Sequence, residues 1–158
     1  MRKPVLVISF IFLSLFSFGQ VGLEFNEAKR LGLVDLDSIY MSAIHSDTTK
    51  AVFKTERERE NLIASYHQML KDFGKFLSEN NFEWKNKTLG FNRVYFNENG
   101  KIDYFLFSFR KSEHELTEHE HNEFQRLLNL FVKDYQFPLT ADTKFVQCSP
   151  VTYLPQKE

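Results

Sequence analysis

The residues best suited to bind a metal ion lie together in one short segment, residues 113–123. It contains His114, His119 and His121, interleaved with glutamates. Imidazole nitrogens and carboxylate oxygens are ligands for zinc, copper and nickel. Because only residues three or four apart converge on a helix, Glu118 with His121, or His119 with Glu123, could each supply two ligands. His114, His119, His121 and Glu118 therefore form the candidate metal site. The alternative is an acidic helix start, favoured by the helix dipole, in which the histidines are incidental.

The candidates for nucleophilic catalysis are fewer. Cys148 is the single cysteine, so neither a disulfide nor a Cys-built zinc site can form within one chain. Its thiol could act as a nucleophile with His45 or His67 as the base, but a lone strand cysteine with apolar neighbours is more typical of a small buried side chain. No G-x-S-x-G serine motif occurs. The sequence therefore favours a non-enzymatic protein and indicates no cofactor.

The first nineteen residues have the pattern of a secretory signal. A basic start, Arg2-Lys3, precedes the apolar run 5–18, and small residues lead to a cleavage point after Gly19. The run is shorter than the roughly 20 residues that a membrane-spanning helix needs. No cysteine that could carry a lipid lies near the cleavage point. We therefore expect a periplasmic or secreted protein that does not span the membrane once the signal is removed.

Charge argues against one class of partner. Without Arg2 and Lys3 the chain has 18 basic residues (20 minus 2) against 21 acidic ones, a net charge of −3. Nucleic-acid binding normally needs a basic face. The sequence therefore predicts no nucleic-acid partner.

Two long helices are predicted by capping boxes followed by apolar stripes. Thr55 with Glu58 begins one over 56–79, and Thr117 with Glu120 begins another that reaches Tyr135. Two shorter helical patterns, at 24–31 and 36–44, precede them.

Three strands are predicted after the first long helix. Residues 92–96 and 102–109 form a hairpin around Asn99-Gly100. Residues 144–154 form the last strand, and Pro150 places it at a sheet edge or at a bulge, since proline donates no ladder hydrogen bond. The expected fold is α+β: an antiparallel sheet of about three strands with two main helices packed on it, plus a short helical N-terminal region. Residues 1–19 are the signal peptide and 20–158 a single domain.

A resemblance covers the C-terminal unit, residues 91–158. The matching residues are the Asn99-Gly100-Lys101-Ile102 turn, the helix through Leu127 to Tyr135, Phe137-Pro138, and the closing Pro150-Val151-Thr152-Tyr153. In this order of strand, strand, helix and strand the unit resembles the C-terminal domain of TonB-type energy transducers. That family also has a membrane anchor and a Pro-rich spacer, so only its use of a sheet edge to pair with a peptide is implied here. The whole chain also resembles small secreted bacterial proteins of unknown function.

These observations give one leading function and two alternatives. The leading one is a small periplasmic or secreted module that binds a protein or peptide partner in the cell envelope through its last strand or an aromatic surface. The candidate contact residues on that strand are Phe145, Gln147, Val151 and Tyr153. The first alternative is a metal-binding envelope protein that uses residues 113–123, and the weaker one is a hydrolase whose residues converge only in three dimensions.

Overall fold

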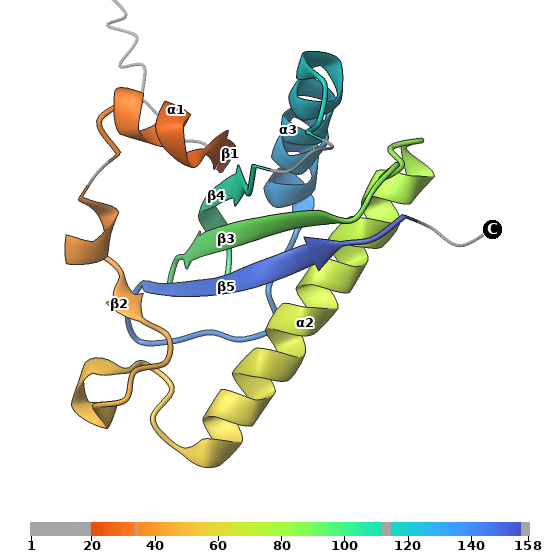
Figure 1. Ribbon diagram of the computed structural model, residues 1–158. Coiled ribbons are helices and arrows are strands. Elements are labelled where there is room, and N and C mark those ends of the chain that lie inside the picture. The colour runs from red at the N-terminus through yellow and green to blue at the C-terminus, as the bar shows by residue number, and fades with distance from the viewer. Residues whose placement is uncertain (1–19, 34, 112–114, 156–158) are drawn as a thin grey trace, which may run out of the picture.

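The computed structural model describes residues 20–33, 35–111 and 115–155. They form a five-stranded mixed sheet in the order β1-β4-β3-β5-β2, shown in Figure 1. The central strands β4, β3 and β5 are antiparallel, whereas β1 runs parallel to β4 and β2 runs parallel to β5. The strands are β1 (Val21–Glu24), β2 (Met41–Ser42), β3 (Thr88–Phe96), β4 (Ile102–Phe109) and β5 (Phe145–Tyr153).

The predicted antiparallel sheet of about three strands is therefore wrong. The three predicted strands are present, but β1 and β2 add a parallel partner at each side. Both come from the N-terminal region that the sequence predicted to be helical. Runs of four and two residues are too short to show the alternation of apolar and polar residues by which a strand is recognised.

Three helices accompany the sheet: α1 (Phe25–Arg30), α2 (Glu56–Glu79) and α3 (Glu118–Asp134). Both predicted capping boxes are confirmed, because the Thr55 and Thr117 hydroxyls accept hydrogen bonds from the Glu58 and Glu120 amides, and each glutamate bonds back to the threonine amide. No helix in the described part of the chain is both long and apolar enough to cross a membrane.

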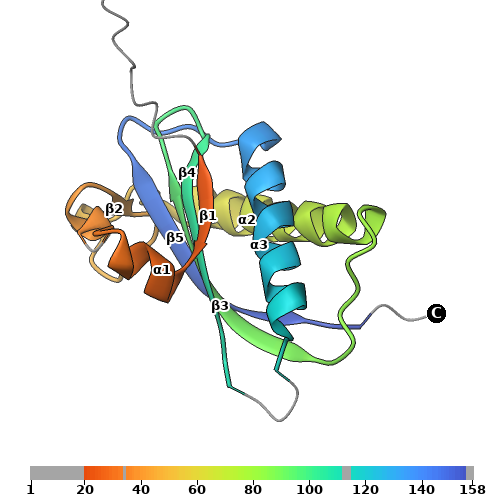
Figure 2. The same cartoon turned by 90° about the horizontal axis from the view of Figure 1, so that it is seen from above.

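The long helices α2 and α3 lie together on one face of the sheet, as Figure 2 shows. Alternate strand residues point into the core beneath them, and many are aromatic. Phe124 of α3 is fully buried and lies within ring-contact distance of side chains from α2, β4, β5 and the loop before β3: Phe73, Phe82, Trp84, Phe107, Phe109 and Tyr153.

Residues 21–33 and 35–40 of the N-terminal segment cover part of the opposite face, which we call the far face. The Tyr40 hydroxyl donates a 2.7 Å hydrogen bond to Asp103 of β4, and the Tyr95 hydroxyl of β3 donates to Asp37. Leu23, Ala28 and Leu36 are buried with Tyr95, Leu106 and Val146 in a second, smaller core there. Figure 2 shows α1 on this side of the sheet, with α2 and α3 on the other. The cover does not reach the end of the sheet where β3 begins, where Leu89 and Phe91 remain more than a third exposed.

Candidate functional site

The outer edge of β5 is paired over only a small part of its length. Its inner side pairs with β3 from Phe145 to Tyr153. Its outer side pairs with β2 at Phe145 and Val146 alone, and over Gln147–Tyr153 no strand of the described chain lies against it. We call this stretch the open edge. The expectation that Pro150 marks an edge is therefore met over the open edge, although β2 makes β5 the second strand in the sheet order.

The hydrogen-bonding groups of the open edge follow from one contact. The Ala43 amide donates to the Val146 carbonyl at 2.9 Å, so the Val146 carbonyl points outward, away from β3. Because ladder bonding alternates along an antiparallel strand, the backbone groups of Cys148, Pro150 and Thr152 also point outward. The backbone nitrogen of Pro150, which carries no hydrogen, therefore faces outward, so the ladder with β3 loses no donor. The open edge offers two amides, at Cys148 and Thr152, and the carbonyls of Pro150 and Thr152, while the Cys148 carbonyl accepts a 3.1 Å hydrogen bond from Gln147 Nε2.

The opposite edge of the sheet is closed by a side chain. On β1, the Gly22 amide donates to Asn129 Oδ1 at 2.9 Å, and Asn129 Nδ2 donates to the Gly22 carbonyl at 2.8 Å. A Cβ at Gly22 would lie 2.6 Å from Leu128 Cγ, so α3 packs directly on this strand. The outward groups of Gly22 are therefore satisfied within the chain, whereas those of the open edge face outward without a strand partner.

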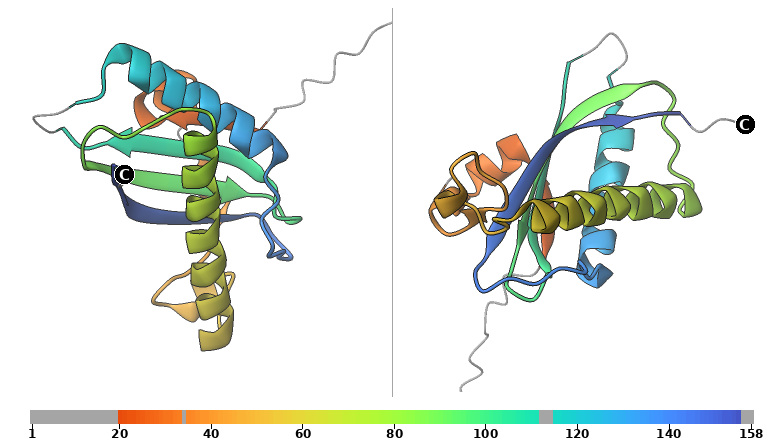
Figure 3. Two further views of the ribbon diagram at one scale, coloured as in Figure 1. Left: turned by 90° about the vertical axis from the view of Figure 1, so that its right-hand side faces the viewer. Right: turned by 90° about the horizontal axis from the view of Figure 1, so that it is seen from below.

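Helix α2 extends past the open edge on the core side of the sheet. Ser149 donates a hydrogen bond to the Tyr66 hydroxyl at 3.1 Å, which marks where α2 crosses β5. Figure 3 shows that the N-terminal half of the helix continues beyond this strand. Three helical residues rise about 4.5 Å, close to the roughly 4.8 Å spacing of strands. Ile63, which is 44% exposed, therefore lies beneath the position that a further strand would occupy.

On the far face, a shallow apolar cup adjoins the open edge. Its floor is the backbone around Gly90, and one side chain, that of Arg110, is charged. The side chains of β3, β4 and β5 that surround it, with the residue after β4, are Leu89, Phe91, Ser108, Arg110, Pro150 and Thr152. Phe25 of α1 borders the cup, with its ring centroid 6.3 Å from that of Phe91. The cup thus lies where the N-terminal cover ends.

The four predicted contact residues on β5 share the core-facing side of the strand. Phe145 and Tyr153 are buried, and Tyr153 stacks on Trp84 at 4.3 Å. Burial also raises the pKa of the Tyr153 hydroxyl. Gln147 and Val151 are partly exposed. The residues whose backbone faces outward were not selected from the sequence; these are Cys148, Pro150 and Thr152. The alternation of residues along a strand could have separated them from the four predicted contact residues.

The candidate metal residues do not converge where the structure describes them. His119 and His121 lie on different sides of α3. His121 packs on the rings of Phe107 and Phe109, and its Nε2 lies 3.7 Å from Glu24. His114 lies outside the described residues. No group of three or more His, Cys, Asp or Glu side chains in the described residues could hold a metal ion, and Glu118 adds no third ligand to His121.

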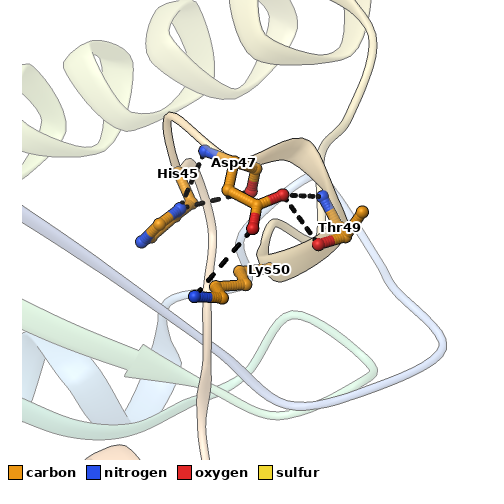
Figure 4. A network of polar contacts seen from close by, with 4 residues as sticks. All are labelled: His45, Asp47, Thr49 and Lys50. Carbon is orange, nitrogen blue, oxygen red and sulfur yellow. Dashed lines mark hydrogen bonds and ion pairs between the residues drawn. The ribbon is translucent and has the colours of Figure 1, made fainter.

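The residues proposed for hydrolysis make a local turn, which Figure 4 shows. His45 Nδ1 accepts a hydrogen bond from the Asp47 amide at 2.9 Å, while the Asp47 carboxylate accepts from the Thr49 amide and hydroxyl. These bonds from Thr49 lower the pKa of Asp47. The carboxylate therefore caps the turn.

Cys148 is exposed, so the interpretation of a buried side chain is wrong. It lies opposite Arg93 on the far face, at a position the N-terminal segment leaves uncovered.

No family model matches the chain, and no curated protein or solved structure matches it either.

Proposed function

We propose that the protein is a non-enzymatic module that binds an extended segment of a protein partner by strand addition at the open edge of β5. The observation that carries this proposal is the difference between the two sides of the sheet. Asn129 satisfies the outward groups of Gly22 on β1, whereas no described strand pairs with the outer side of β5 over Gln147–Tyr153, where the amides of Cys148 and Thr152 face outward. Exposed strand edges are templates for pairing, and natural proteins usually protect them with charged side chains. β5 carries no charged residue from Phe145 to Tyr153.

Pro150 limits this pairing. It removes one donor from the middle of the open edge, which leaves bonding positions at Cys148 and Thr152 on either side. A bound strand would thus accept from two amides separated by Pro150, whose carbonyl still accepts, and non-specific pairing along the whole edge would be weaker.

The test uses substitutions that remove outward amides without breaking the ladder to β3. Cys148→Pro with Thr152→Pro removes both amides of the open edge, and the matched control, Cys148→Ser with Thr152→Val, keeps them. The probe is a fluorescent ten-residue peptide of alternating Val and Thr, titrated by fluorescence anisotropy and by amide NMR shifts. We expect binding to the wild type and to the control, with shifts centred on Cys148 and Thr152, and at least tenfold weaker binding to the proline variant. Equal binding by the proline variant and the control would exclude strand addition at this edge.

The cell envelope is the proposed place of this interaction. It rests on the signal pattern of residues 1–19. Mass spectrometry of the protein purified from its cells should give a chain that begins at Gln20, and a chain that retains Val5 would contradict this location.

A further inference from the structure

The far-face cup and the open edge share two residues. The backbones of Pro150 and Thr152 face the open edge, and their side chains line the cup. A strand added beside them would direct alternate side chains to the far face, next to this apolar surface. Leu89 and Phe91, on the neighbouring strand β3, are 38% and 39% exposed there. One partner segment could therefore pair with the edge and cover the rim of the cup.

Positive charge gathers at the same end of the sheet. Arg110 lines the cup and its amide donates to the Leu89 carbonyl at 2.8 Å, so it continues the pairing of β4 with β3. Lys111 follows it, and Lys87 immediately precedes β3 beside the end of β5. None of the three forms an ion pair with another described residue. Arg110 and Lys111 also line a neighbouring hollow with Glu24 and Glu115, whereas the cup itself has Arg110 as its one charged side chain.

We propose that the partner is an acidic, alternately apolar segment: it pairs with β5, places apolar side chains toward Pro150 and Phe91, and carries carboxylates at the end nearest Thr152. This inference rests on the strand addition proposed above and specifies the chemistry of the bound segment. Complementary charge also sets the orientation, because only one direction of the added strand brings its acidic end to Lys87 and Arg110.

The experiment compares two probe peptides that differ in charge at one end. Both alternate Val and Thr over eight residues, and they end in two Asp or two Lys. For the wild type at about 50 mM salt we expect the Asp peptide to bind about tenfold more tightly, since a few partly exposed ion pairs contribute modestly and are screened by salt. The ratio of the two affinities should fall toward one at about 500 mM salt.

Charge-reversal variants locate the effect. Lys87→Glu with Arg110→Glu should abolish or reverse the preference for the Asp peptide. The control, Arg57→Glu with Lys101→Glu, makes the same change in net charge at exposed positions away from the cup and should retain it. Loss of the preference in the control as well would overturn the inference, because the effect would then come from net charge.

The remaining outcomes are distinguishable. If both peptides bind the wild type equally, the acidic partner is wrong while strand addition stands. If neither peptide binds, strand addition itself fails. If sedimentation shows that the chain associates with a second copy, and Cys148→Pro with Thr152→Pro separates the copies, the copies are joined through the open edge. The partner is then the protein itself and the inference is overturned.

Discussion

Asn129 occupies the place beside β1 that another strand would otherwise take. Its amide group resembles a peptide unit, so it can accept from the Gly22 amide and donate to the Gly22 carbonyl at once. It also donates to the Gln125 carbonyl one turn earlier in α3, which fixes its orientation. One side chain thus joins the helix layer to the first strand.

Replacing Asn129 with Ala should lower the free energy of unfolding by about 1–3 kcal/mol, because two partly buried backbone groups lose their partner. Urea denaturation measures the change. Asn122→Ala, an exposed position on the same helix, is the control and should change stability by less than about 0.5 kcal/mol. Equal midpoints for the two variants would show that the contact with Gly22 contributes nothing.

Glu120 gives the fold a dependence on acid. The Lys85 ammonium, 2.6 Å from the carboxylate, and the Thr117 amide and hydroxyl lower the pKa of Glu120 from 4.5 to about 2. Because the folded pKa is the lower one, the contribution to stability is complete above pH 4.5 and is lost as the pH falls toward 2.

In Glu120→Gln this dependence should be absent. The variant should be less stable than the wild type at neutral pH, and the difference should shrink below about pH 4.5 and vanish near pH 2. Urea titrations at a series of pH values measure it, with Glu118→Gln in the same turn as the control. A difference that stays constant with pH would contradict the ionic contribution.

Helix α2 contains a glycine that the folded chain does not require. Gly74 lies in the helix interior, and a Cβ added there would meet no atom within 4 Å. Glycine in a helix costs about 0.5–1 kcal/mol relative to alanine.

Gly74→Ala should therefore raise the free energy of unfolding by that amount, measured as a higher urea midpoint. The reverse change at an exposed position of the same helix, Ala64→Gly, should lower it by a similar amount. A destabilised Gly74→Ala variant would mean that the open space beside the helix is needed by the fold.

The long elements were predictable from the sequence, and the short ones were not. The predicted helix at 56–79 has the bounds of α2, because a capping box and a repeat over many turns mark it at both ends. β1 and β2 depend instead on partners distant in sequence, which no local pattern encodes. The same limit applies to the site: Pro150 indicated an edge, but the sequence could not show that Val146 sets which backbone groups face outward.

The aromatic side chains around Phe124 connect the layers of the molecule. Phe124 contacts rings from α2, β4, β5 and the loop before β3, so its removal would leave a cavity at the centre of the core. Trp84, the single tryptophan, is 8% exposed and belongs to this group, which makes its fluorescence a direct report on the core.

Phe124→Ala should lower the free energy of unfolding by about 3–5 kcal/mol, a large part of the stability of an ordinary domain. Urea unfolding followed by Trp84 fluorescence measures it. Phe91→Ala, on the exposed far face, is the matched control and should cost less than about 1 kcal/mol. Similar losses in the two variants would contradict the central place of Phe124.

The strand order also determines when the outer strand pairs can form during synthesis. The two outermost strands come from the beginning of the chain, yet β1 pairs with β4 and β2 pairs with β5, which lie about 80 and 100 residues later. Because synthesis runs from the N-terminus, β1 has no sheet partner until β4 has been made, and β2 has none until β5 has been made. During synthesis β1 and β2 therefore remain without a strand partner, and the β2 pair can form only after β5 has been made.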